Sequence, residues 1–176
     1  MKISDFQSAL QRHGGVQRQH RWRVILNLPP TVASADLIKD MSLTAITTQL
    51  PPSTLGEILI PYAGREIPLP GDRKFEPFPI TFIGVEDDAI HEACEAWSEL
   101  FNGTESNTQT GALEDLMVDV ELQLLREDDS VIRSYFLEGS WPQEVGSLEL
   151  DKQSQDSFSQ FTLTLRYIQH THNKTL

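Results

Sequence analysis

Apolar and polar residues alternate over several segments of the chain, and this pattern predicts β-strands that each bury one face. The strands are expected at residues 21–28, 43–50, 78–83, 116–126, 131–139 and 158–168. In the segment 116–126, for example, valine and leucine occupy every second position, with acidic and amide side chains between them. With the hairpin described below, the pattern predicts about seven or eight strands.

One segment has the apolar spacing of a helix. Apolar residues recur at helical intervals over residues 88–101, so that Trp97 is expected to point inward. A carboxylate at Asp87 or Asp88 provides the N-terminal cap. Strands grouped before and after a single helix predict an antiparallel β-sandwich or open barrel with one flanking α-helix, and they do not indicate a parallel βαβ sheet.

Residues 53–77 have the composition of a proline-rich hairpin. Two stretches with apolar residues flank Ala63 and Gly64, which favour a tight turn. Three prolines lie within these stretches: Pro61, Pro68 and Pro70. Because proline has no N–H to donate, it is confined to the edges of sheets. The hairpin is therefore expected to project from the body of the subunit.

The two ends of the chain are polar. Residues 1–20 are expected to form a flexible basic arm, and residues 169–176 a polar C-terminal tail, on either side of one β domain at 21–168. No apolar run approaches the 18 residues of a membrane-spanning helix, and the N-terminus has no apolar signal segment. The sequence thus predicts a protein without a membrane anchor that folds in the cytoplasm.

Charge is unevenly distributed along the 176 residues. The net charge is −12, but residues 1–23 hold five basic groups and one acid, so the remaining chain holds nine basic and 25 acidic groups, a balance of −16. An acidic body argues against a surface that grips nucleic acid, which requires clustered Lys and Arg. It is compatible with a surface past which nucleic acid slides without binding.

Catalytic and metal-binding motifs are not evident in the sequence. The acidic triplets 86–88 and 127–129 are explained by a helix cap and a hairpin turn. The pair His170 and His172 has no third ligand nearby, and His91 is expected on the helix surface. The single Cys94 is expected to be buried. We predict no enzyme, no cofactor and no metal site.

Four motifs follow one another in a characteristic order. The most specific is Gly-Asp-Arg-Lys-Phe-Glu-Pro at 71–77, directly after the proline-rich hairpin. The others are Gln-Leu-Pro-Pro-Ser-Thr-Leu-Gly at 49–56, Tyr-Phe-Leu-Glu-Gly-Ser-Trp-Pro at 135–142 and Phe-Thr-Leu-Thr-Leu-Arg-Tyr at 161–167. In order and spacing the chain resembles the tail tube proteins of contractile-tailed, T-even-like bacteriophages.

This resemblance implies a fold, an assembly and partners. It implies a mainly β, phage tail-tube fold whose copies form hexameric rings, with their inner strands joined into one large barrel. The rings would stack into a tube inside the sheath, located in the virion tail and assembled in the host cytoplasm. The implied partners are further copies of the chain, the tail sheath protein, the tape measure protein in the lumen, and baseplate and tail terminator proteins. Double-stranded DNA would pass through the tube without specific binding.

Two sets of residues are expected to serve the assembly. By the resemblance, the hairpin at 55–75 contacts the next ring, and its candidate residues are Leu55, Ile58, Ile60, Tyr62, Arg65, Ile67, Leu69, Asp72 and Arg73. The candidate acids of the lumen are Glu57, Asp119, Glu121 and Glu138.

Other functions are compatible with the same pattern. The chain could be a baseplate tube initiator, or a tube subunit of a type VI secretion or phage-tail-like bacteriocin particle, which would differ from a tail tube in partners and not in fold. A small acidic enzyme or carbohydrate-binding β-sandwich would need a concave pocket with convergent polar groups.

Overall fold

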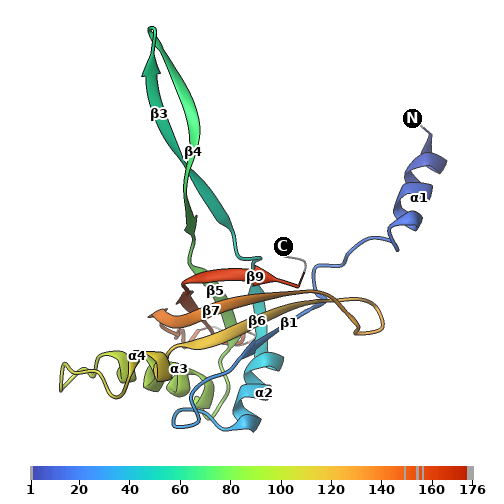
Figure 1. Ribbon diagram of the computed structural model, residues 1–176. Helices are drawn as coiled ribbons and strands as arrows, with labels where there is room; N and C mark the ends of the chain where they lie inside the picture. Colours follow the sequence, from blue (N-terminus) through green and yellow to red (C-terminus); the bar gives the residue numbers. More distant parts are fainter. Residues whose placement is uncertain (1, 149, 154, 156, 174–176) are drawn as a thin grey trace.

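The computed structural model describes residues 2–148, 150–153, 155 and 157–173. Within these residues the chain forms four helices and nine strands (Figure 1). In chain order they are α1 (Ile3–Arg12), β1 (Trp22–Leu26), α2 (Ala35–Thr44), β2 (Ala45–Thr48), β3 (Ser53–Tyr62), β4 (Arg65–Phe75), β5 (Phe78–Ile83), α3 (Ala89–Phe101), α4 (Leu113–Leu116), β6 (Val118–Leu125), β7 (Val131–Val145), β8 (Gln160–Arg166) and β9 (Gln169–His172).

Seven strands form one sheet in which every pairing is antiparallel. The long strand β7 belongs to two parts of it. Its first half lies in a four-stranded part with the order β1-β6-β7-β9, which we call sheet A. Its second half pairs with β8 in a part with the order β7-β8-β5-β2, which we call sheet B. The fold is therefore mixed α/β with a mostly antiparallel sheet.

Sheets A and B share one hydrophobic core. Alternate residues of β5, β6 and β8 are buried, as their sequence pattern predicts, and they pack together with residues of α2 and α3. Trp97 of α3 is completely buried, and its indole N–H donates to the carbonyl of Leu116 at 2.9 Å. Cys94 on the same helix is also buried, and burial raises the pKa of its thiol to about 12.

The sequence-based boundaries differ from the structure at several elements. One helix was expected, and the described residues contain four. The segment 43–50 was expected to be a strand; α2 continues through Thr44, and the strand β2 covers only Ala45–Thr48. Strand β7 was expected to end before Trp141. It continues to Val145 because a register shift after Pro142 lets the strand pass from sheet A to sheet B.

Both polar ends of the chain contain regular structure. Residues 3–12, in the expected flexible arm, form the helix α1. Residues 169–172, in the expected tail, form β9, which pairs with the first half of β7. The end of that tail, 174–176, lies outside the described residues. Thus the sheet extends beyond the expected domain boundary at 168.

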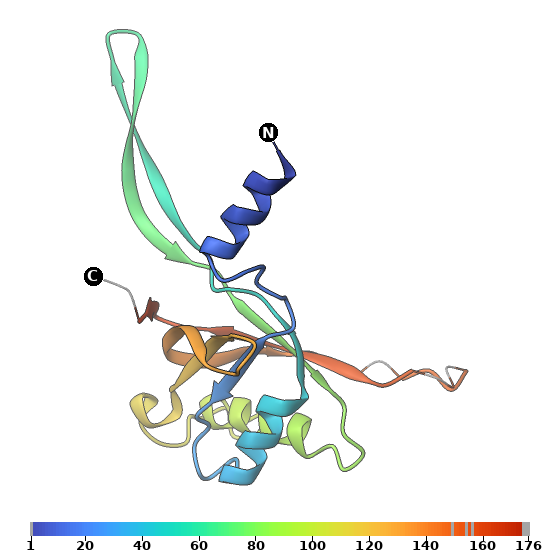
Figure 2. The same cartoon turned by 90° about the vertical axis from the view of Figure 1, so that its right-hand side faces the viewer.

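Strands β3 and β4 form a separate two-stranded ribbon that leaves the body of the subunit (Figure 1). No residue of the ribbon is buried, and every residue from Glu57 to Pro70 is exposed. In Figure 1 and in the view of Figure 2, turned by 90°, the ribbon and α1 extend from the same end of the body.

Candidate assembly surfaces

The outward face of sheet A is mainly polar, although it also carries Phe136, and it gathers three of the four candidate lumen acids. Glu121 on β6 lies opposite Phe136 on β7, and Glu138 two residues further along β7 lies opposite Gln169 on β9. Asp119 joins this group because its carboxylate accepts from the N–H of Gly139 at 3.0 Å. The fourth candidate, Glu57, lies apart on the exposed ribbon.

Hydrogen bonds tie the carboxylates of this face to neutral neighbours. Glu138 accepts from the amide of Gln169 at 2.6 Å and from the hydroxyl of Thr171 at 3.2 Å. Glu121 accepts from the amide of Gln123 at 2.7 Å, and the carbonyl of that amide accepts from Arg23 at 2.6 Å. The three carboxylates and the one guanidinium leave this face with a net negative charge.

Both faces of the ribbon β3–β4 carry apolar side chains. Residues directly opposite in an antiparallel pair share a face. Ile58 pairs with Leu69 and Ile60 with Ile67, and this set is called the isoleucine face. The opposite face carries Leu59, Pro61, Pro68 and Pro70 together with two acids, Glu57 and Glu66, and is called the proline face. The four side chains of the isoleucine face are each 44–53% exposed, so the subunit alone leaves this apolar surface in water.

The remaining ribbon candidates lie at its two ends. Tyr62 and Arg65 pair beside the turn, whose residues Ala63 and Gly64 both have positive φ, as a type I′ turn requires. Near the body, Leu55 pairs with Arg73, which also donates to Ser53 at 2.9 Å, and Asp72 precedes it. All nine candidates therefore lie on the ribbon, and the sequence analysis omitted a further apolar residue there, Leu59, which is 50% exposed.

A close approach of two glycines marks the bend of the ribbon. The register shifts between Leu55 and Glu57, so that Gly56 and Gly71 face each other. A Cβ on Gly71 would lie 3.1 Å from the backbone carbon of Gly56, closer than ordinary packing permits. Only glycine fits at this point without a shift of the strands.

The edges of sheet A are open within the described part of the chain. There β1 pairs only with β6, and β9 pairs only with β7. Each edge therefore presents a row of backbone N–H and C=O groups to solvent. Such edges pair readily with a further strand.

The base of the ribbon packs on the edge strand β9. Phe75, the last residue of β4, contacts the ring of His170 at a centroid distance of 5.1 Å and that of Tyr167 at 5.8 Å. Burial, with the nearby charges of Arg73 and His172, lowers the pKa of His170. Burial also raises the pKa of the Tyr167 hydroxyl. The sequence analysis assigned His170 to a solvated tail. It missed this contact because only the pairing of β9 brings the ring to Phe75.

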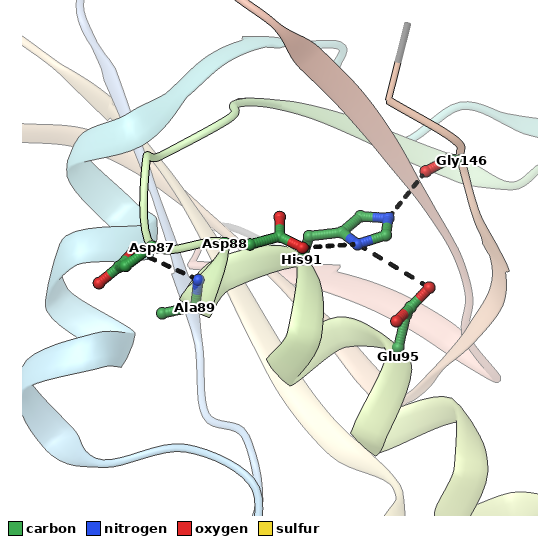
Figure 3. Close-up of polar contacts among 6 residues, drawn as sticks. All are labelled: Asp87, Asp88, Ala89, His91, Glu95 and Gly146. Carbon is green, nitrogen blue, oxygen red and sulfur yellow. Dashed lines mark hydrogen bonds and ion pairs between the residues drawn. The ribbon is translucent and has the colours of Figure 1, made fainter. Parts of the chain in front are cut away.

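His91 has a structural position that the sequence analysis did not predict. Its side chain is 13% exposed, because the ring packs edge-on against Phe161 at 4.8 Å. As Figure 3 shows, Nε2 lies 3.3 Å from the carbonyl of Gly146, and Nδ1 lies 3.8 Å from Asp88 and from Glu95. The expectation of a surface residue is therefore wrong. His91 links the first turns of α3 to the end of β7.

The acidic triplets serve local structure. Asp87 accepts from the N–H of Ala89 at 3.3 Å at the start of α3 (Figure 3). Asp128 accepts from the N–H and hydroxyl of Ser130 in the β6–β7 turn, and these bonds lower the pKa of its carboxyl. Among the described residues no group of His, Cys, Asp or Glu is arranged to hold a metal ion, and no helix there is long and apolar enough to cross a membrane.

Within the described residues, the chain is thus a mixed α/β subunit with two open edges in sheet A and a ribbon that exposes apolar side chains. Residues 17–173 match the phage tail tube protein family, and the chain therefore belongs to that family. The resemblance inferred from the four motifs is confirmed. The family is structural and non-enzymatic, and its members are components of the phage tail in the virion.

Individual relatives agree with this assignment. The chain is 48% identical over 167 residues to the tail tube protein of Serratia phage KSP90, covering 95% of this chain and 94% of that protein. It is 29% identical over 120 residues to tail tube protein gp19 of Enterobacteria phage T4, covering 67% of this chain and 73% of that protein.

Two solved structures share the fold. A protein in the sheath–tube complex of an extracellular contractile injection system has a TM-score of 0.59 at 14% identity, covering 98% of both chains. A protein in the baseplate of the anti-feeding prophage has a TM-score of 0.62 at 16% identity, covering 88% of this chain and 93% of that one. At these identities the likeness concerns the fold.

Proposed function

We propose that this tail tube subunit joins copies of itself head to tail in a ring of six, and that the rings stack into the hollow tube of a contractile tail. The observation that carries the proposal is sheet A, which has two open edges and a polar outer face. Head-to-tail pairing closes into a ring when the rotation between copies permits. The number six comes from the resemblance to the family.

The directions of the edge strands allow neighbouring copies to pair in an antiparallel ladder. Each of the three pairings in sheet A is antiparallel, so the edge strands β1 and β9 of the four-stranded sheet run in opposite directions. In a ring all copies have the same orientation. Strand β9 of one copy then meets β1 of the next as an antiparallel neighbour, which is the ladder already used inside the subunit.

The polar face of sheet A suits the inner wall of the tube. Its opposite face is occupied by the core, so the carboxylates at 119, 121 and 138 face solvent. Barrels of 16–18 strands already leave a water-filled channel, and about 24 strands from six copies enclose a wider one. A negative wall repels phosphate, so DNA passes without binding.

The ribbon suits contacts between rings. A two-stranded ribbon without support is marginal in water, and this one exposes apolar side chains far from the body. Burying the isoleucine face against the next ring would stabilise both the ribbon and the stack. The prolines stiffen the ribbon, because each fixes its own φ.

The other partners follow from the tube itself. A hollow tube in a contractile tail accommodates a tape measure protein and DNA in its bore, a sheath outside it, and baseplate and terminator proteins at its ends. The relative of similar fold in a sheath–tube complex supports the contact with a sheath. High identity to a tail tube protein over nearly the full length favours the main tube over a tube initiator or a secretion tube.

Assembly of the purified chain tests the proposal. We expect negative-stain images at high protein concentration to show six-fold rings and stacked tubes. A chain lacking residues 55–73 should give a folded subunit that does not stack, as measured by circular dichroism and sedimentation. A strictly monomeric full-length protein under assembly conditions would contradict the proposal, and an unfolded deletion variant would show that the ribbon belongs to the core.

A further inference from the structure

Helix α1 presents an apolar stripe that its own subunit leaves uncovered. Ile3, Phe6 and Leu10 recur at helical spacing on one side of the helix, and none of the helix residues is buried. Ile3 is 80% and Phe6 61% exposed. A ten-residue helix is marginal in isolation. A surface that covers the stripe would therefore stabilise α1, which lies outside the residues matched by the family.

Two glycines end α1 with a defined C-terminal cap. The N–H of Gly15 donates to the carbonyl of Leu10 at 2.8 Å, and the N–H of Gly14 donates to that of Gln11 at 3.1 Å. This pair of bonds is a complete Schellman motif, which both glycines permit because their φ angles are positive. Residues 13–21 then connect the helix to β1, and nine residues can span up to about 30 Å.

The connection starts at one edge of sheet A, and the ribbon starts at the other. Arg21 anchors the connection beside β1 by donating to the carbonyl of Arg126 at 2.9 Å and pairing with Glu127 at 3.3 Å. The ribbon base packs on β9 through Phe75 and His170. When β1 of one copy lies beside β9 of the next, α1 of the first copy comes next to the ribbon of its neighbour. Both also extend from the same end of the body (Figures 1 and 2).

The proline face of the ribbon is available as the counterpart. A ribbon has two faces, and the proposed contact with the next ring uses the isoleucine face. Leu59 and the three prolines on the other side stay exposed.

We propose that α1 docks its apolar stripe on the proline face of the ribbon of the neighbouring copy in the same ring. This inference rests on the proposed ring. The occupant is a second copy of this chain, because the edge geometry brings the two bare surfaces together only between subunits. This docking would stabilise the contact between neighbouring copies of one ring before the next ring is added.

Cysteine cross-linking in assembled tubes tests the contact. One batch of protein carries Phe6→Cys, a second carries Leu59→Cys, and the two are mixed before assembly. Oxidation should link them into a dimer. Two matched controls should link at least tenfold less: Ser8→Cys, on the opposite side of α1 from the stripe, with Leu59→Cys, and Phe6→Cys with Ile60→Cys, on the isoleucine face. The native Cys94 does not compete, because it is buried with its thiol pKa raised to about 12.

Hydrogen exchange gives a second readout. The amides of α1 should exchange at least tenfold more slowly in tubes than in the dilute subunit. In the variant Phe6→Ser this protection should be lost although tubes still form. Two results would overturn the contact and leave the proposed ring intact. One is that α1 in tubes exchanges its amides as fast as in the dilute subunit. The other is that a double variant, Phe6→Cys with Leu59→Cys, forms the link only within its own chain. Failure of the wild-type chain to assemble at all would refute the ring and the contact together.

Discussion

The isoleucine face of the ribbon allows the stacking contact to be tested quantitatively. A fully buried Leu or Ile contributes about 1.5–3 kcal/mol. Leu69 and Ile58 are 44% and 53% exposed in the subunit, so stacking can still bury about half of each. Each therefore contributes about 1 kcal/mol to the contact. Replacing both by serine removes about 2 kcal/mol per subunit, which raises the critical concentration for tube formation about 30-fold.

The assay is the concentration of protein left in the supernatant after tubes are pelleted. The matched control is Leu113→Ser, which removes a leucine of similar exposure, 46%, from α4 at a distance from the ribbon. It should leave the critical concentration within about twofold of wild type. Ile58 and Leu69 are not in the core, so the double variant should keep the melting temperature of the dilute subunit. A critical concentration that is equal for the double variant and the control would refute the stacking role of this face.

Three further predictions address the bore, the bend of the ribbon and its base. Glu121→Lys with Glu138→Lys should leave tubes intact in electron micrographs but slow DNA release from particles, and unchanged release would remove the electrostatic argument. Gly71→Ala should prevent stacking without lowering subunit stability, because its Cβ would press on Gly56; tubes of normal stability would show that the bend is not required. Burial lowers the pKa of His170, so the unfolded chain binds more protons below pH 6.5 and stability falls as pH decreases through that range. His170→Phe should reduce the loss of melting temperature between about pH 7.5 and about pH 5.5, and an unchanged loss would assign it to other groups.

The strands and the long helix could be predicted because their signals are local. The alternation in β6 and the stripe around Trp97 reflect burial against one common core, so periodicity alone reveals them. The ribbon could be predicted from Ala63 and Gly64 together with its prolines. These features depend only on residues close to one another in the chain.

The remaining elements depend on contacts that periodicity does not report. Strand β9 has no apolar alternation, because one of its faces bonds to Glu138 and the other packs on the rings of Phe75 and Tyr135. None of the residues of α1 is buried in its own chain, so no pattern of core positions marks this helix. Its polar composition therefore led to the prediction of a flexible arm, despite its three apolar positions. His91 was misjudged because the ring of Phe161, 70 positions later, covers it.

The candidate lumen acids show the same division. Alternation placed Asp119 and Glu121 on the outward face of a strand, and the structure agrees. That Glu138 joins them follows only from the β6–β7 and β7–β9 registers. No local signal distinguished Glu57, which lies on the ribbon and shares no sheet face with the other three.

The central claim is that sheet A is completed by neighbouring copies and faces the bore. A cryo-electron microscopy reconstruction of tubes grown from the purified chain tests it directly. We expect β9 of each copy to pair with β1 of the next in an antiparallel ladder, with the carboxylates at 119, 121 and 138 lining the channel. A reconstruction in which these edges stay unpaired, or in which this face points away from the axis, would contradict the account.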